Sequence, residues 1–228
     1  MKVERMRLSV VIPAYNEEKN IQFLLRSLKK IIEIDEIIVV DDGSRDRTGE
    51  LAEKEGVKVI PLKKNYGKGY ACFEGFKESR GEVVLFLDAD IKFKKEDILA
   101  LIAPIFNNEA DMTVAGFNKF SGKTKGGFGM VKNFARIGLF LFTGIYFHFP
   151  LSGQRAVKRE FLKDCKFFSG GYGMEVGITI EVIKRGGRVK EIITNMQHDR
   201  TERNLKGFLH RGKQLLDIIF AFAQKVII

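Results

Sequence analysis

The sequence predicts a single α/β domain with a mostly parallel, doubly wound central sheet, and three observations support this fold class. Short apolar segments alternate regularly with amphipathic helical segments through the first half of the chain. Polar residues follow each apolar segment at its carboxyl end. The run Val83–Leu87 is too short for a helix and suits a central strand, and two carboxylates, Asp88 and Asp90, follow it. Because open α/β sheets bind ligands beyond the carboxyl ends of their strands, a binding site is expected there.

The first two strand–helix units follow from apolar spacing and from turn residues. Leu8–Ile12 is an apolar run that ends at Pro13, and we expect a strand there. Segment 17–30 is expected to be a helix, because its apolar residues recur at helical spacing. These residues are Ile21, Leu24, Leu25 and Leu28. Ile37–Val40 is predicted as the second strand, and segment 46–55 as a short helix that ends at Gly56.

The third unit combines a strand at Val57–Ile60 with a helix at Tyr70–Ser79, and the strand Val83–Leu87 follows it. The second half is less regular, and its expected elements are taken from apolar runs alone. Strands are predicted at 111–116, 151–157 and 188–194, and helices at 128–147, 175–184 and 205–226. Residues 118–127 form a polar, glycine-rich and basic loop, which we interpret as a candidate lid.

The charge balance indicates anionic partners. Lys and Arg number 39 against 29 Asp and Glu, which gives a formal net charge of +10 and a pI near 9.5. Phosphorylated metabolites and acidic lipid surfaces fit this charge. A nucleic-acid partner is not expected, because no nucleic-acid-binding motif accompanies it. Cys72 and Cys165 are far apart and match no metal spacing, so we expect core positions in a reducing, cytosolic setting.

The sequence gives no sign of a targeting segment or of a membrane span. Met1–Arg7 lacks the apolar region of a signal peptide, and the longest apolar stretch, Ile137–Phe147, is too short to cross a bilayer. We therefore expect a cytoplasmic protein. The apolar end of segment 205–226 leaves open a peripheral contact with the inner face of the membrane, a homodimer contact, or an ordinary core helix.

Four motifs at predicted strand ends carry candidate chemistry, and each also has a purely structural interpretation. In P-A-Y-N-E, Tyr15 could stack on a base, or the motif could simply begin a helix. In D-D-G-S, Asp42 could bind a nucleoside, or the motif could be a plain turn. The basic, glycine-rich segment 64–69, which includes Lys68, suits a diphosphate but lacks P-loop spacing. Asp88 and Asp90 suit Mg²⁺ or Mn²⁺, or an Asx turn.

In chain order, the strings P-A-Y-N-E-E, V-V-D-D-G-S-x-D-x-T, N-x-G-K-G-x-A and F-L-D-A-D lie within residues 8–91. Together they resemble the family 2 glycosyltransferases of the GT-A fold. The resemblance implies a nucleotide-sugar donor, with UDP favoured and GDP open, a divalent cation, and sugar transfer to an acceptor. It implies that residues 1–116 bind the donor and that residues 117–228 bind the acceptor. The donor-binding residues it implies are Pro13, Ala14, Tyr15, Glu17, Asp42, Lys68 and Asp88.

The second half resembles two subgroups of these enzymes. The stretch S-G-Q-R-A followed by R-E at 159–160 is similar to dolichol-phosphate-mannose-synthase-like enzymes. The stretches G-Y-G-M-E-V-G at 171–177 and Q-H-D-R at 197–200 are similar to glucosyl-3-phosphoglycerate synthases. The second resemblance implies that His198 completes a metal site with Asp88 and Asp90; alternatively, His198 is a solvated loop histidine. In support, Lys92 stands where the first subgroup often has a metal-binding Gln, and Lys does not bind a metal at neutral pH.

The family resemblance also implies roles for three residues of the acceptor half. Glu175 faces donor or acceptor sugar, as a base or as a positioning group; alternatively, it only favours the helix dipole. Arg155 and Arg200 are candidates for diphosphate or acceptor phosphate, next to the alternative of a solvated basic face. A small phosphorylated acceptor and a polyprenyl-phosphate or glycolipid acceptor both remain open. A non-enzymatic nucleotide-sugar binder is the remaining alternative, and the intact D-x-D motif argues against it.

Overall fold

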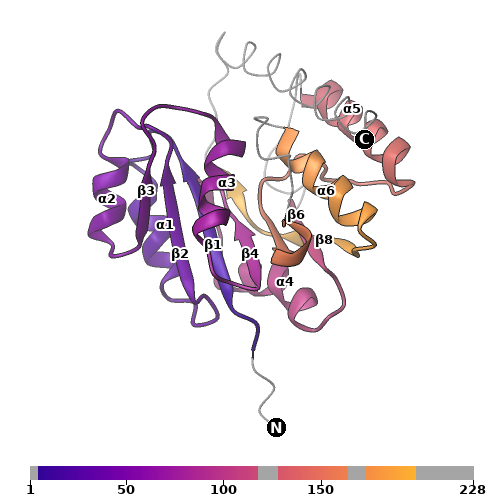
Figure 1. Cartoon of the computed structure of the whole chain (residues 1–228), viewed down its shortest axis with the longest axis horizontal. Helices are drawn as coiled ribbons and strands as arrows, with labels where there is room; N and C mark the ends of the chain where they lie inside the picture. Colours follow the sequence, from indigo (N-terminus) through magenta and orange to yellow (C-terminus); the bar gives the residue numbers. More distant parts are fainter. Residues whose placement is uncertain (1–4, 118–127, 164–172, 199–228) are drawn as a thin grey trace.

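The computed structural model describes residues 5–117, 128–163 and 173–198 (Figure 1). Nine strands and six α-helices occur in this part of the chain. The first half contains β1 (Leu8–Ala14), α1 (Ile21–Leu28), β2 (Glu36–Asp41), α2 (Thr48–Lys54), β3 (Lys58–Pro61), α3 (Lys68–Glu78), β4 (Val83–Phe86), β5 (Ile91–Lys92) and α4 (Lys95–Phe106). The second half contains β6 (Met112–Phe117), α5 (Phe128–Thr143), β7 (Arg155–Lys158), a 3₁₀ turn (Arg159–Phe161), α6 (Met174–Lys184), β8 (Val189–Thr194) and β9 (Gln197–His198).

The main sheet has seven strands in the order β3-β2-β1-β4-β7-β6-β8. Strands β1 to β4 are parallel to their neighbours in this group, and β6 is parallel to β8. Strand β7 is antiparallel to both β4 and β6. The predicted fold class, an α/β domain with a mostly parallel central sheet, is therefore confirmed, and β4 occupies the centre of the sheet.

Alternation along the strands divides the core into two layers of helices. Leu8, Val10 and Ile12 of β1 pack in one apolar cluster with α1 and α4. Val11 points the other way and packs in a second cluster, with Phe76 of α3 and with α6. Figure 1 shows α3 and α6 in front of the sheet. Because both faces are covered, the central strands consist almost entirely of apolar residues.

Several boundaries differ from those that the sequence predicts. Helix α4 was not predicted, although Ile98, Leu101 and Ile105 are buried at helical spacing; Pro104 lies in its last turn. Helix α1 begins at Ile21 instead of at residue 17, because residues 18–20 form a turn in which Asn20 N and Ile21 N donate to Glu17 O (3.0 and 2.9 Å). The strand predicted at 151–157 is shorter, since only Arg155–Lys158 is paired. The candidate lid 118–127 and segment 205–226 lie outside the described residues.

Two further expectations concern cysteine and membrane spans. Cys72 of α3 is fully buried in the apolar cluster that contains Val11 and Phe76, and burial raises the pKa of its thiol. Cys165 lies outside the described residues. In the part of the chain that the structure describes, no helix has both the length and the apolarity needed to cross a membrane.

One buried carboxylate joins three strands at the edge of the sheet opposite the carboxyl end of β4. Asp111, just before β6, accepts hydrogen bonds from Arg188 N (2.9 Å) and Arg188 Nε (3.0 Å) before β8. It also pairs with Lys158 Nζ at the end of β7 (2.6 Å). Hydrogen bonds from Arg188 and Lys158 hold the pKa of the Asp111 carboxyl well below its usual range, against the opposing effect of burial.

We predict that Asp111→Asn lowers the free energy of unfolding at pH 7 by about 2–3 kcal/mol, because it removes a buried charge from two cations. A carboxyl whose pKa is lowered by folding stabilises the native state above its unfolded pKa of about 3.9, and that stabilisation is lost as the pH falls through the folded value. The wild type should therefore lose stability more steeply than the variant below about pH 4. Urea titrations at several pH values measure both effects.

Glu109→Gln provides the matched control, because Glu109 lies two residues away and pairs with Lys190 on the surface (2.9 Å, both side chains about half exposed). Its loss should cost less than about 1 kcal/mol. Equal destabilisation by the two substitutions would contradict the proposed importance of Asp111.

Candidate functional site

The carboxyl ends of β1, β2 and β4 lie at one edge of the sheet, because these strands are parallel. Backbone hydrogen bonds extend the alignment beyond the strands. Asp42 N donates to Ala14 O (2.8 Å), and Leu87 N donates to Val11 O (3.1 Å). The segments after these strands therefore start side by side, as the sequence predicts.

Side chains tie the loop after β1 to the loop after β2. Asn16 N donates to Ser44 Oγ (2.9 Å), and Arg45 N donates to Asn16 Oδ1 (2.8 Å). Glu17 N donates to Thr48 Oγ1 (2.7 Å). Asn16 has a φ of 57°, a left-handed conformation that Asn tolerates better than most residues. The P-A-Y-N-E and D-D-G-S motifs thus form one connected structure.

Asp42 organises the loop before α3. Its two oxygens accept hydrogen bonds from Tyr66 N (2.7 Å) and Gly67 N (2.8 Å). The side chain is buried, and burial raises the pKa of Asp42, although the two backbone donors oppose this. Gly43 makes this approach possible, because it has a φ of +72° and a Cβ there would lie 2.5 Å from the backbone of Lys64. Asp42 therefore fixes the position at which Lys68 begins α3.

Lys68 lies between two acidic side chains from distant parts of the sequence. Its Nζ is 2.6 Å from Asp88 Oδ1, beyond the end of β4, and 3.1 Å from Glu175 Oε1, in the first turn of α6. Burial disfavours the charged form of Lys68, but the two carboxylates outweigh it and raise the pKa of Lys68 above its usual value. The ammonium group therefore stays charged and joins α3, β4 and α6.

Two residues that the sequence did not single out complete the surroundings of Asp88. Gln154 is fully buried, and its Nε2 donates to Asp88 Oδ2 (2.7 Å). Gly153 lies over the Lys68–Asp88 pair: a Cβ on Gly153 would be 2.3 Å from Lys68 Nζ and 2.7 Å from Asp88 Oδ2. Both residues belong to the S-G-Q-R-A stretch, so a motif was visible, but its contact with Asp88 was not.

Glu175 has one carboxylate oxygen without a hydrogen-bond partner among the described residues. Only 2% of the residue is exposed, Oε1 faces Lys68, and Oε2 is the unpartnered oxygen. A buried carboxylate oxygen is costly unless something donates to it. The arrangement can therefore receive a hydroxyl or another donor from a ligand.

Arg155 has a different position from the one expected for a phosphate ligand. It is fully buried, and its guanidinium donates to the backbone oxygens of Ser152 (Nε, 3.2 Å) and Glu175 (Nη1, 2.6 Å). The side chain thus connects the segment before β7 to the first turn of α6. The structure does not support the predicted contact with phosphate, and Arg155 instead holds Glu175 in position.

Asp90 and Glu17 concentrate negative charge beside this cluster. Burial raises the pKa of Glu17, and the charges of Asp90, Asp46 and Asp88 raise it further, while a hydrogen bond from Asn20 opposes them. A cation near these carboxylates would relieve the repulsion among them. Carboxylate oxygens are suitable ligands for Mg²⁺ or Mn²⁺.

The pairing of two short strands also brings the backbone of His198 close to that of Asp90. Strands β5 and β9 are antiparallel, with Ile91 opposite His198 and Lys92 opposite Gln197. Asp90 immediately precedes Ile91. The side chain of His198 lies outside the described residues, and among those described no group of three or more His, Cys, Asp or Glu side chains could hold a metal.

The remaining predicted donor residues lie at the same edge. Pro13 and Ala14 are the last residues of β1, with Ala14 buried, and Tyr15 follows with a half-exposed side chain. The structure therefore leaves the Tyr15 ring accessible to a ligand. Arg200 lies outside the described residues.

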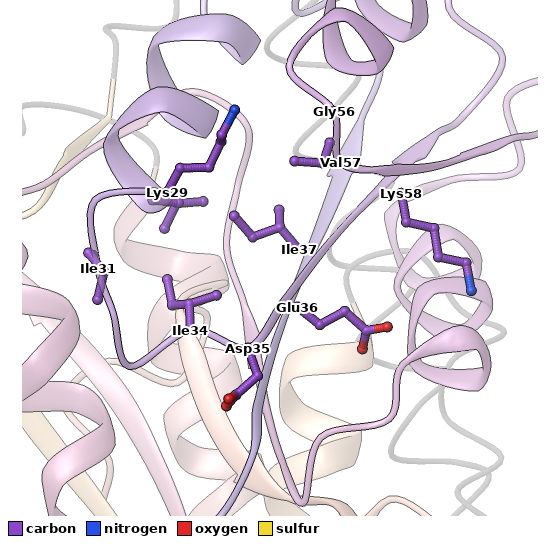
Figure 2. Close-up of a pocket in the computed structure, with 10 residues that line it drawn as sticks. Lys29, Ile31, Ile34, Asp35, Glu36, Ile37, Gly56, Val57 and Lys58 are labelled. Atoms are coloured by element: carbon purple, nitrogen blue, oxygen red, sulfur yellow. The ribbon is translucent and has the colours of Figure 1, made fainter.

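A separate pocket lies at the opposite edge of the sheet (Figure 2). It is lined by the amino-terminal ends of β2 and β3, including Glu36 and Lys58. Its charged side chains already have partners: Glu36 accepts from Ser9 Oγ (2.6 Å), and Lys58 pairs with Glu78 (2.6 Å). The pocket is therefore remote from the clustered carboxylates and does not contribute to this site.

Known proteins resemble this chain in sequence and in structure. The model of the family "Glycosyl transferase family 2" matches residues 9–166. An uncharacterized protein of Methanocaldococcus jannaschii is 31% identical over 228 residues, which cover 92% of this chain and 98% of that protein. The undecaprenyl-phosphate 4-deoxy-4-formamido-L-arabinose transferase of Pseudomonas paraeruginosa is 44% identical over 105 residues, but the match covers 42% of this chain and only 31% of that enzyme.

Solved structures of glucosyl-3-phosphoglycerate synthase from Mycobacterium tuberculosis share the fold. The complex with phosphoglyceric acid has a TM-score of 0.79 and 26% identity, and the match covers 97% of this chain and 81% of that one. The complex with Mn²⁺, UDP and glucosyl-3-phosphoglycerate has a TM-score of 0.77 and 25% identity, over 97% and 81% of the two chains. The resemblances that the sequence indicated, to family 2 and to both of its subgroups, are thus confirmed. Because the family model covers well over half of its residues, this chain belongs to glycosyl transferase family 2.

Proposed function

We propose that this protein is a metal-dependent hexosyltransferase that moves a hexose from a nucleotide sugar to an acceptor. UDP-sugar is the favoured donor and GDP-sugar the alternative. The proposal rests mainly on one observation: Lys68, Asp88 and Glu175 form a charged cluster at the carboxyl edge of the sheet, with an unpartnered Glu175 oxygen. The UDP complexes of the glucosyl-3-phosphoglycerate synthase favour UDP over GDP.

In this proposal the donor lies across the carboxyl ends of β1, β2 and β4. Tyr15 stacks on the base, and Glu17 contacts the nucleoside. Asp42 acts by holding the backbone of Tyr66 and Gly67. Lys68 faces the diphosphate, where its positive charge stabilises the leaving group.

The cation in this proposal is Mg²⁺ or Mn²⁺ held by Asp90 and His198. Both oxygens of Asp88 already have partners, because one pairs with Lys68 and the other accepts a hydrogen bond from Gln154. The main role of Asp88 in this proposal is therefore to orient the donor. A divalent cation in this position would neutralise charge on the departing nucleoside diphosphate. The Mn²⁺ and Mg²⁺ complexes of the similar synthase support the choice of metal.

Glu175 is proposed to receive a hydroxyl of the acceptor or of the donor sugar at its unpartnered Oε2. Lys68 holds the other oxygen, and Arg155 holds the backbone of the same residue, so the carboxylate is fixed before a ligand binds. It serves as a base if transfer inverts the sugar, and as a positioning group if transfer retains its configuration.

A small phosphorylated acceptor is favoured, because the structural match to the synthase that binds phosphoglyceric acid covers nearly the whole chain. A polyprenyl-phosphate acceptor is the second candidate, supported by the sequence match to the undecaprenyl-phosphate transferase over 42% of the chain. A binder of nucleotide sugars without catalysis would keep the donor site but would not need Glu175.

We predict that Asp90→Asn removes metal-dependent turnover of UDP-glucose, with a fall in kcat/KM of at least about 100-fold, because the charge that holds the cation is lost. UDP release is measured across a Mn²⁺ titration. In thermal-shift assays, UDP with Mn²⁺ should raise the Tm of the wild type but not of the variant. Glu109→Gln, on the remote surface, should match the wild type; unchanged turnover in Asp90→Asn would refute the assignment.

A second prediction concerns the contact of Gly153 with the Lys68–Asp88 pair. Gly153→Ala should lower kcat by at least about tenfold, because the added methyl group displaces the pair and a small misplacement is costly in catalysis. Gly186→Ala is the control: its φ of +77° makes Ala strained, but its Cβ would meet nothing within 4 Å. The control should lose about 1 kcal/mol of stability and keep full activity. The reverse pattern would exclude a role for Gly153.

The acceptor is tested by incubating UDP-glucose and Mn²⁺ with 3-phosphoglycerate or with a polyprenyl phosphate in detergent. We expect glucosylated phosphoglycerate as the product, and we expect Glu175→Gln to abolish it while leaving the UDP-induced rise in Tm intact. A lipid-linked product instead would establish the second candidate. Donor binding without transfer to any acceptor would favour the non-catalytic alternative.

A further inference from the structure

Helix α5 (Phe128–Thr143) carries apolar side chains on two opposite faces. On one face, Val131, Ala135 and Leu139 repeat at intervals of four residues and are buried. They pack against Val176 and Ile180 of α6. This face accounts for the contact between α5 and the rest of the domain.

The opposite face of α5 is also apolar, but it is exposed. Ile137 and Leu141, one turn apart, are 61% and 75% exposed. We define the α5 patch as the six exposed apolar side chains of this helix and the turn after it: Phe134, Ile137, Phe140, Leu141, Ile145 and Tyr146. Figure 1 shows α5 on the outer side of α6, at the end of the molecule opposite α2. An exposed patch of several apolar side chains marks an interaction site.

The surroundings of the α5 patch are basic. From Met112 to Arg159 the sequence contains no Asp or Glu. Lys132 Nζ lies 5.1 Å from the centre of the Phe149 ring, and Arg136 Nη2 donates to His148 O (2.8 Å) beside the patch. In a homodimer formed through the α5 patch, these cations would come close to one another, and residues 112–159 contain no carboxylate that could pair with them. An anionic surface would complement them.

The turn that carries Ile145 and Tyr146 is fixed in place. Glu191 of β8 accepts hydrogen bonds from His148 N (2.8 Å) and Phe149 N (2.6 Å). The Arg136 guanidinium lies 5.6 Å from the centre of the Tyr146 ring. The nearby carboxylate of Glu191 is thus occupied by backbone N–H groups, and the turn that carries the exposed apolar side chains is held by these hydrogen bonds.

We propose that the α5 patch docks this protein on an anionic lipid bilayer, with its apolar side chains in the interface and its basic neighbours on the headgroup phosphates. Apolar side chains on one face with Lys and Arg at the margins are the features of helices that lie in a membrane interface. The proposal goes beyond the proposed function and does not depend on it. It would also bring α6, which begins beside Glu175, close to the membrane surface.

The test is co-sedimentation of the full chain with vesicles of phosphatidylcholine, with and without phosphatidylglycerol. We expect binding to the anionic vesicles that weakens in about 1 M salt, where the Debye length falls to about 3 Å. The double substitution Ile137→Ser with Leu141→Ser should lower the partition coefficient at least about tenfold, because two inserted side chains lose their apolar contact. Thermal melts check that the variant remains folded.

The matched control is Phe23→Ser with Ile32→Ser, which removes apolar side chains of comparable size that are 66% and 83% exposed near α1. It should bind vesicles like the wild type, and an equal loss would refute the assignment to α5. If the wild type does not bind vesicles, the proposal fails. Light scattering then shows whether the α5 substitutions dissociate a dimer, in which case a second copy covers the patch. Loss of sugar transfer with retained vesicle binding would contradict only the proposed function.

Discussion

The buried ion pair between Lys68 and Asp88, extended to Glu175, is the interaction on which the candidate site depends. It joins the start of α3, the end of β4 and the first turn of α6, which are far apart in the sequence. Side chains in this cluster are mostly buried, so removing one partner would leave an uncompensated charge at a cost of about 3–5 kcal/mol. The arrangement therefore requires all three residues at once.

The cluster of Lys68, Asp88 and Glu175 is held in place by the segment around the start of β7. Gly153 permits the backbone before β7 to approach Lys68 and Asp88, and Gln154 satisfies the second Asp88 oxygen. Arg155, the next residue, holds the backbone of Glu175. Three consecutive residues, two before β7 and the first residue of that strand, thus contact Lys68, Asp88 and Glu175.

The sequence predicted the donor half of the fold better than the acceptor half, for physical reasons. Apolar runs followed by polar residues locate β1, β2 and β4 and the edge at which Asp88 and Asp90 lie. The contact between Asp88 and Gln154 spans 66 residues, and no local pattern reveals it. Arg155 is a phosphate candidate in the sequence because a guanidinium fork suits phosphate, whereas in the structure the guanidinium donates to backbone oxygens within the fold. The apolar spacing of Ile98, Leu101 and Ile105 indicates helix α4, although Pro104 in its last turn is unfavourable within a helix.

The two aspartates of the D-x-D motif have different electrostatic surroundings, although they are only one residue apart. Asp88 is neutralised by Lys68, whose pKa is raised by the pair itself, so a divalent cation at Asp88 would have to displace a bound ammonium group. Burial raises the pKa of Glu17, and the charge of Asp90 raises it further. A cation near Asp90 would lower the energy of both carboxylates without breaking the Lys68 pair. In the proposed function, Asp88 therefore orients the donor through its pair with Lys68, and Asp90 is the carboxylate that contributes to the metal site.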